Sequence, residues 1–188
     1  DIPIQHASDN ILKRMGRRTN QAELRDMIAR LRERIPDICL RTTLITGFPG
    51  ETQEDHEELM AFVDEMEFDR LGVFTYSAEE DTPAAEMPDQ VDEGERQRRA
   101  DIITSEQEIR MGEYYAGMVG NTYEVVCEGL IEGRLPDENA YAARTYMDAP
   151  NVDGLVFVQT SRELMTGDFV KVKITGSYEY DLIGEIVE

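Results

Sequence analysis

The spacing of hydrophobic positions in the first part of the chain predicts three helices. In residues 20–34 the apolar side chains recur three or four positions apart, which is the period of an amphipathic helix. Asn20 and Glu23 occupy the positions of a capping box at its start. We expect a second helix after Thr52, whose hydroxyl can cap it, and a long third helix over residues 93–115.

Short runs of β-branched and other apolar residues predict strands between these helices. Three such runs cover residues 1–6, 38–46 and 71–76, and a polar, proline-containing loop follows at 77–90. Alternating strands and helices are typical of a parallel sheet with right-handed crossovers. A closed (β/α)8 barrel needs on the order of 200 residues or more. We therefore expect a partial (βα) barrel whose first strand is an exposed edge, as in a segment excised from a longer protein.

The pattern changes after about residue 118, where apolar runs become short and turn residues separate them. Five strands are expected, at residues 122–127, 140–146, 155–159, 169–175 and 182–187. Five short strands within about 70 residues favour a small all-β antiparallel barrel of OB-like character. The sequence thus predicts an α/β domain over residues 1–117 and a β-barrel domain over residues 118–188.

The charge of the chain narrows the class of partner. Nineteen basic and 40 acidic residues give a net charge of −21, and the barrel domain alone holds five basic against thirteen acidic residues, a net charge of −8. Binding to nucleic acid generally needs lysine and arginine to neutralise phosphates. An acidic surface suits a basic protein partner, or serves solubility alone.

Cysteine and histidine are too few and too scattered to build a metal site or a disulfide framework. Cys39 and Cys127 lie far apart, and His6 and His56 are isolated, so neither pair has the spacing of a zinc site. The chain has no long apolar run and no signal-peptide pattern. We therefore expect a cytoplasmic protein that does not insert into a membrane.

One short motif has the form of a ligand-binding loop. Residues 44–52 read Leu-Ile-Thr-Gly-Phe-Pro-Gly-Glu-Thr and connect a predicted strand to a predicted helix. Ligands of parallel α/β sheets bind at that end of the strands, and glycines let the backbone approach a flat ligand. The alternative is an ordinary tight turn, which also favours glycine and proline.

Three further residues are candidates for the same site. Arg41 lies in the preceding strand, where its charge needs a ligand anion or a neighbouring carboxylate. Gln5 ends the first strand, and Tyr76 ends the third. Gln5 could instead make ordinary strand-end hydrogen bonds, and Tyr76 could be a core aromatic residue. A basic run over residues 13–34 could contact ribosomal RNA or form a solvated helix face.

Four linked stretches resemble those of the radical S-adenosylmethionine (SAM) methylthiotransferase family, in the form of the branch that acts on a ribosomal protein. They begin with Asp-Ile-Pro-Ile-Gln-His-Ala-Ser at the start of the chain, and the last contains Asp-Ala-Pro-Asn-Val-Asp-Gly; the four lie at residues 1–8, 41–52, 68–84 and 144–154. The final barrel is similar to a TRAM domain. The resemblance covers essentially the whole chain.

The resemblance implies an activity, cofactors and a partner. It implies transfer of a methylthio group to the β-carbon of an aspartate of ribosomal protein S-twelve of the small subunit, with SAM and two 4Fe-4S clusters in the full-length enzyme. This chain lacks both sets of cluster cysteines, so we expect it to bind no cluster and to be inactive alone. The alternatives are a tRNA methylthiotransferase, which the acidic barrel makes a poor fit, and a non-catalytic protein-binding module.

The resemblance also suggests roles for individual residues. The SAM side of the pocket is expected to consist of the loop and the three further candidates: Gln5, Arg41, Gly47, Phe48, Pro49, Gly50, Glu51 and Tyr76. Asp148 and Asp153 of the barrel are expected to hold the basic substrate protein. No residue of this chain is expected to be catalytic or to bind a metal.

Overall fold

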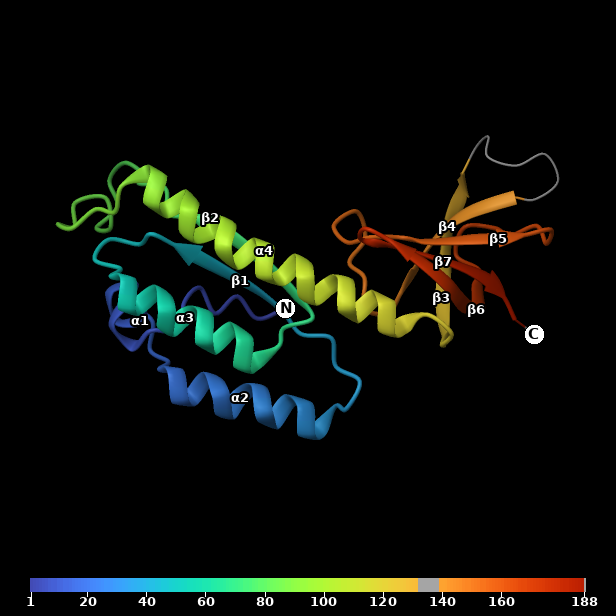
Figure 1. Cartoon of the computed structure of the whole chain (residues 1–188), viewed down its shortest axis with the longest axis horizontal. Helices are drawn as coiled ribbons and strands as arrows, with labels where there is room; N and C mark the ends of the chain where they lie inside the picture. Colours follow the sequence, from blue (N-terminus) through green and yellow to red (C-terminus); the bar gives the residue numbers. More distant parts are fainter. Residues whose placement is uncertain (132–138, 188) are drawn as a thin grey trace. The chain divides into compact units, whose positions relative to one another are not determined.

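A computed structural model describes residues 1–131 and 139–187, which divide into two compact units (Figure 1). The units are Asp1–Glu108 and Ile109–Glu188, so their boundary falls within one long helix, α4 (Glu93–Met118). The domain boundary expected between residues 117 and 118 stays a prediction.

The first unit is built on two parallel strands, β1 (Arg41–Thr46) and β2 (Arg70–Thr75), paired in register from Arg41 opposite Arg70 to Thr46 opposite Thr75. The strand expected at residues 1–6 is wrong. Gln5 forms a single parallel bridge with Leu44, and its φ of 71° takes the backbone out of the extended region. The segment still lies along β1, because Gln5 donates to the Thr43 carbonyl at 2.9 Å and accepts from the Ile45 N–H at 2.8 Å.

Helices α2 (Gln21–Arg34) and α3 (Gln53–Met66) begin where the sequence places them. Asn20 caps α2 in a capping box with Glu23, as predicted, and the predicted Thr52 cap of α3 is present, in a box with Asp55. The third expected helix is α4, three residues longer than predicted. A short helix, α1 (Asp9–Arg14), was not predicted, because its six residues carry too little periodicity.

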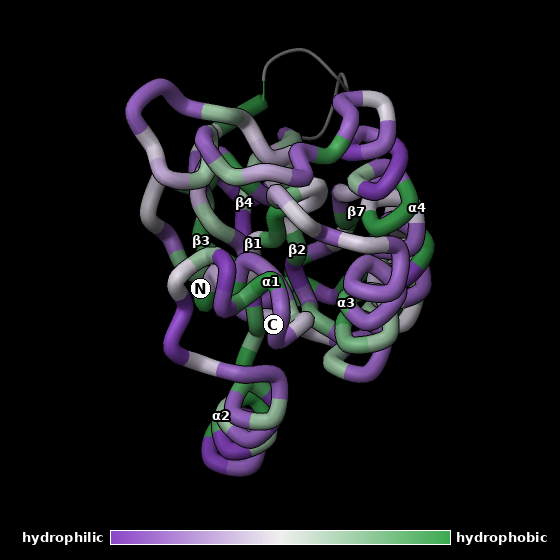
Figure 2. The backbone as a smooth tube through the Cα atoms, turned by 90° about the vertical axis from the view of Figure 1, so that its left-hand side faces the viewer, coloured by the Kyte–Doolittle hydropathy of each residue, from purple (hydrophilic) through white to green (hydrophobic). Residues whose placement is uncertain are grey.

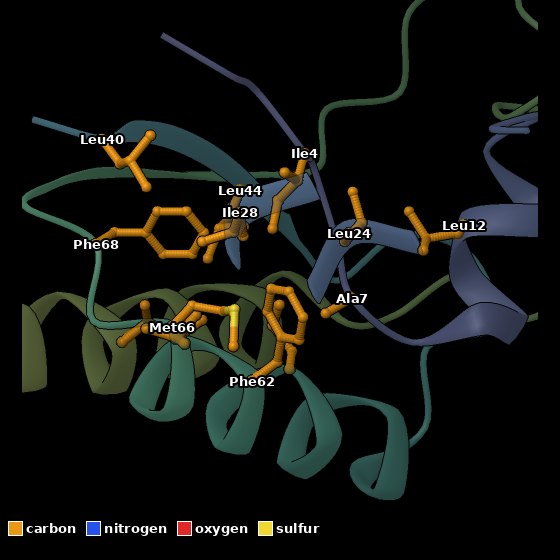
Figure 3. Packing of buried hydrophobic residues seen from close by; sticks show 13 residues of the cluster. Ile4, Ala7, Leu12, Leu24, Ile28, Leu40, Leu44, Phe62, Met66 and Phe68 are labelled. Carbon is orange, nitrogen blue, oxygen red and sulfur yellow. The ribbon is translucent and has the colours of Figure 1, made fainter. Parts of the chain in front are cut away.

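Apolar side chains from all these elements meet in one core (Figure 3). Phe62 and Met66 of α3 point toward Ile28 of α2, Leu44 of β1 lies among them, and Ile103 brings α4 into the same cluster. Figure 2 shows green and purple positions interspersed along α2 and α3, as expected of helices with one buried side. Each fully buried side chain of this size contributes roughly 1.5–3 kcal/mol, so this core fixes β1 and its following loop.

The second unit is a closed barrel of five strands in the order β3-β4-β5-β7-β6. The strands are β3 (Thr122–Ile131), β4 (Asn139–Thr145), β5 (Val156–Thr160), β6 (Phe169–Tyr178) and β7 (Asp181–Ile186). All five match the predicted runs, and the closed five-stranded form is OB-like, as expected. One feature differs from the prediction: β5 pairs with β7 in parallel, so the barrel is not wholly antiparallel. Among the described residues, no helix is both long and apolar enough to span a bilayer.

Candidate functional site

The loop that follows β1 is shaped by two glycines with left-handed backbone. Gly47 has a φ of 72° and Gly50 a φ of 83°, values that residues with side chains rarely adopt. A Cβ at Gly47 would collide with Cβ and Cγ of Arg96, close to the α4 backbone, whereas one at Gly50 would meet only the guanidinium end of Arg14, which can move aside. Glycine is therefore required by conformation and by space at Gly47, and by conformation at Gly50.

The Glu51 carboxylate holds this loop from inside. Its Oε2 accepts from the N–H of Gly47 at 2.5 Å and of Phe48 at 3.2 Å. Its Oε1 accepts from Nη1 of Arg99 on α4 at 3.0 Å, and the same nitrogen donates to the Glu51 carbonyl. Both side chains are buried, so the ion pair is shielded from water. Glu51 therefore fixes the backbone of the loop and does not face the solvent.

Two histidines lie beside this ion pair. His6 Nε2 is 3.9 Å from Oε2 of Glu51, and His56 Nδ1 is 3.8 Å from Oε1. Burial, reinforced by the Arg99 charge, lowers the pKa of His6 to about 3 and that of His56 to about 4, so both are neutral near pH 7. Burial raises the pKa of the Glu51 carboxyl, and the Arg99 guanidinium opposes that rise.

Aromatic packing joins the loop to the end of β2. The rings of Phe48 and Tyr76 meet edge to face with centroids 5.3 Å apart, and the Tyr76 N–H donates to the Thr46 carbonyl at 2.8 Å. Arg96 of α4 lies over the Tyr76 ring at 5.4 Å and donates from Nη1 to the Tyr76 carbonyl at 2.8 Å. The two arginines of α4, Arg96 and Arg99, thus hold the ends of both strands.

A pocket of about 460 Å³ opens beside this loop, within the first unit. Its volume lies in the range of small-molecule sites. The apolar part of its wall comes from Met15, Ile45, Phe48 and Met87, and the polar part from Gln5, Arg14 and Arg17. The remaining lining residues are Gly16, Thr82, Pro83 and Ala84. The pocket therefore combines an apolar floor with an amide and two guanidinium groups.

The structure brings together seven of the eight residues expected on the cofactor side. Gln5 and Phe48 line the pocket, and Tyr76 packs against Phe48. Gly47, Pro49, Gly50 and Glu51 belong to the same loop as Phe48 but do not line the pocket themselves. Arg41 is the exception. It begins β1, roughly 17 Å before the loop at strand geometry, and so lies at the opposite end of the strand. A role in binding stays a prediction for all eight residues.

Sequence reasoning missed the two arginines that line the pocket. Arg14 donates from Nη1 to the Pro49 carbonyl at 3.3 Å, and Arg17 lines the pocket beside it. Both belong to the basic run, in which two later members instead pair with acids: Arg25 with Glu65 of α3 at 2.8 Å, and Arg30 with Asp26 of α2 at 3.4 Å. The only signal was the density of arginines, which does not indicate which of them turn toward a pocket.

In the barrel, the two acids expected to dock a substrate organise their own loop. Asp148 is buried and accepts from the N–H and hydroxyl of Thr145 at 2.9 and 2.7 Å. Asp153 accepts from the Ala149 N–H at 2.6 Å. These bonds define the loop between β4 and β5; contact with a partner stays a prediction for both residues.

No cluster of three or more His, Cys, Asp or Glu side chains able to hold a metal occurs within residues 1–131 and 139–187. Cys39 and Cys127 lie one in each unit, and neither forms a disulfide. Two cysteines are too few for the three thiolates of a cluster site.

Comparison with known proteins finds one protein family that matches a segment of the first unit and another that matches the barrel. Residues 1–63 match the Radical SAM superfamily, and residues 119–187 match the TRAM domain. A protein of Lachnoclostridium phytofermentans named ribosomal protein uS12 methylthiotransferase RimO is 57% identical over 98% of this chain. Over nearly its whole length, the chain is similar to RimO proteins. RimO proteins of Geobacter sulfurreducens and Alkaliphilus oremlandii are 48% and 46% identical over 100% and 99% of the chain.

The chain spans about two fifths of the length of these RimO relatives, 41% for two of them and 42% for the third. The fold expected from the sequence, a partial radical SAM domain followed by an OB-like TRAM barrel, is confirmed. Most residues that line the pocket lie in the segment that matches the Radical SAM superfamily, and the barrel is the segment that matches the TRAM domain.

Proposed function

We propose that this chain is part of a radical SAM methylthiotransferase that modifies an aspartate of ribosomal protein uS12 at its β-carbon. The proposal rests above all on the 57% identity, over 98% of the chain, to a protein named for that activity. The pocket at the end of β1 supports it, because ligands of parallel sheets bind at that edge. We further propose a cytoplasmic setting, with uS12 and not tRNA as the partner.

The residues that line the pocket beside the Gly47–Glu51 loop fit one side of a SAM site. Ile45 and Phe48 give the pocket an apolar wall suited to a purine ring, and the glycine loop lets backbone groups approach the ligand. When bound, SAM supplies both the radical source and the methyl group. The contribution of this chain is to position the ligand and exclude water; Glu51 and Arg99 keep the loop in place from behind.

The clusters do not fit this chain by itself. With only Cys39 and Cys127, in different units, the chain cannot supply three converging thiolates. We therefore propose that the cluster ligands belong to the remainder of the full-length enzyme, and that this chain alone does not cleave SAM. Reconstitution of the chain with iron and sulfide, followed by an assay for 5′-deoxyadenosine, should give no product.

The function itself is tested with the full-length protein that contains this chain. Reconstituted enzyme, SAM and reductant are incubated with purified uS12 or with tRNA, and each substrate is examined by mass spectrometry. We expect one aspartate of uS12 to gain a methylthio group in place of a hydrogen. Modification of tRNA but not of uS12 would favour the tRNA enzyme, and modification of neither would favour a non-catalytic binding module.

A further inference from the structure

Arg17 stands out in the pocket because its guanidinium has no partner within residues 1–131 and 139–187. Within the described part of the chain, no hydrogen bond or ion pair of its side chain is found, and the residue is exposed. Its neighbour Arg14 is half-buried and already donates to the Pro49 carbonyl. One cation of the pocket is therefore used to hold the loop, and the other remains available.

The charge of the pocket is opposite to that of the chain. The chain as a whole carries −21, yet the residues that line the pocket include two arginines and no acid. Glu79, Glu80 and Asp81 precede the lining residue Thr82 but do not line the pocket themselves. A cavity lined by two guanidinium groups and no carboxylate suits an anionic group of a ligand.

We propose that Arg17 recognises the carboxylate of the substrate aspartate. This inference rests on the proposed function and names a specificity-determining residue within the same pocket. The reacting β-carbon is bonded directly to that carboxylate, so a guanidinium that grips both oxygens also fixes the carbon to be modified. Arg17 is exposed, where a side chain of an incoming protein arrives; a SAM molecule has to be enclosed more deeply.

Gln5 lines the same pocket, and its side-chain amide donates to the Pro3 carbonyl at 3.5 Å. Its backbone is held against β1 by two hydrogen bonds, from its N–H to Thr43 and to its carbonyl from Ile45. Recognition of the carboxylate therefore depends on the guanidinium of Arg17. A guanidinium accepts no hydrogen bond, so an asparagine in place of the aspartate would offer its NH2 group to a donor. Discrimination between aspartate and asparagine is therefore the property that Arg17 should confer.

The test uses the full-length enzyme and two forms of uS12, one natural and one with the target aspartate replaced by asparagine. Equilibrium binding of each form is measured for the unaltered enzyme and for Arg17→Gln. We expect the unaltered enzyme to prefer the aspartate form by roughly tenfold or more, the loss typical of charged hydrogen bonds. Arg17→Gln should abolish this preference and leave the affinity for the asparagine form nearly unchanged.

Two further variants make the result specific. Arg18→Gln removes a neighbouring exposed arginine that does not line the pocket, and it should keep the preference. Arg17→Lys keeps the charge but loses the paired N–H donors of the guanidinium, which can bind both carboxylate oxygens. It should therefore retain only part of the preference for the aspartate form. SAM binding, measured separately, should be the same in all four proteins.

Each other outcome is decisive. A preference that persists in Arg17→Gln overturns the inference while leaving the proposed function intact. A loss of SAM affinity in Arg17→Gln, with the preference unchanged, assigns the guanidinium to the carboxylate of SAM and also overturns it. If the unaltered enzyme neither binds nor modifies uS12, the proposed function fails and the inference fails with it.

Discussion

At the scale of single residues, the buried pair of Glu51 and Arg99 has the largest predicted effect. Glu51→Gln removes the buried negative charge beside Arg99, whose guanidinium keeps a second carboxylate partner, Glu95, at 2.8 Å. Because Arg99 retains this counter-ion, the variant should cost about 2 kcal/mol, less than the loss of a buried charge's only partner. We expect a loss of that size in the free energy of unfolding, measured by urea denaturation.

A matched control lies on the surface. Glu65 pairs with Arg25 at 2.8 Å, but both side chains are largely in water, so Glu65→Gln should leave stability almost unchanged. Equal losses in the two variants would contradict the view that burial makes the Glu51 pair important. SAM binding by the full-length enzyme should also weaken in Glu51→Gln, because the carboxylate holds the N–H groups of Gly47 and Phe48.

The buried histidines predict a dependence of stability on pH. Their pKa values, about 3 for His6 and about 4 for His56, lie below the ordinary value of 6.5. Between pH 6.5 and 4 the unfolded chain therefore binds protons that the folded chain does not, and stability falls as pH is lowered. Each histidine contributes roughly 1.4 kcal/mol per pH unit to this slope.

His56→Leu isolates one of these contributions. Neither ring nitrogen of His56 has a hydrogen-bond partner among the described residues, so leucine removes no bond. Between pH 6 and 4.5 the unfolding free energy should depend on pH less steeply in the variant. The slope should fall by about 1.4 kcal/mol per pH unit, which corresponds to one proton. An unchanged slope would mean that His56 is protonated in the folded state.

How far the sequence predicts these residues depends on the distance along the chain. The loop Gly47–Glu51 was identified because the glycines and proline that mark it are consecutive or nearly so in the sequence. Its partners were not, because Arg99 is 48 positions from Glu51 and only the folded chain brings them together. Gln5 was correctly expected beside the loop that follows β1. Its left-handed backbone, with a φ of 71°, could not be predicted, because a residue other than glycine gives no sequence signal for that conformation.

At the scale of elements, local signals predicted most of the starts and ends. The capping boxes at Asn20 and Thr52 and all five barrel strands were found, since each depends on residues a few positions apart. The parallel pairing of β5 with β7 was missed, because strand neighbours far apart in sequence leave no local pattern.

Closure of the barrel depends on a close contact at Gly154, before β5. A Cβ at this position would collide with the backbone carbonyl of Tyr180, which cannot move aside as a flexible side chain could. We expect Gly154→Ala to lower the stability of the barrel by about 1–3 kcal/mol. Gly176→Ala in β6 is the control, since a Cβ there meets nothing within 4 Å. Comparable losses in thermal unfolding of the two variants would show that the contact is unimportant.

At the scale of the whole molecule, the two units differ in whether their sheet is closed: the second unit is a closed barrel, and the first has a two-stranded sheet with an open edge. The barrel closes on itself through five strand pairs and has its own buried residues, such as Val125, Val158 and Ile174. We expect a segment covering Ile109–Glu188 to unfold in a single cooperative transition when heated by itself. A gradual change in circular dichroism without a transition would contradict this.

The two-stranded sheet of the first unit has the opposite character. Among the described residues, β2 pairs only with β1, so its other edge has unpaired backbone groups, and Phe74 is 62% exposed on that strand. Such an edge is a template for another strand. When this chain is concentrated, self-association should therefore begin at β2, and a lysine in place of Phe74 should delay the onset of turbidity. The closed barrel presents no such edge, so it should remain clear under the same conditions.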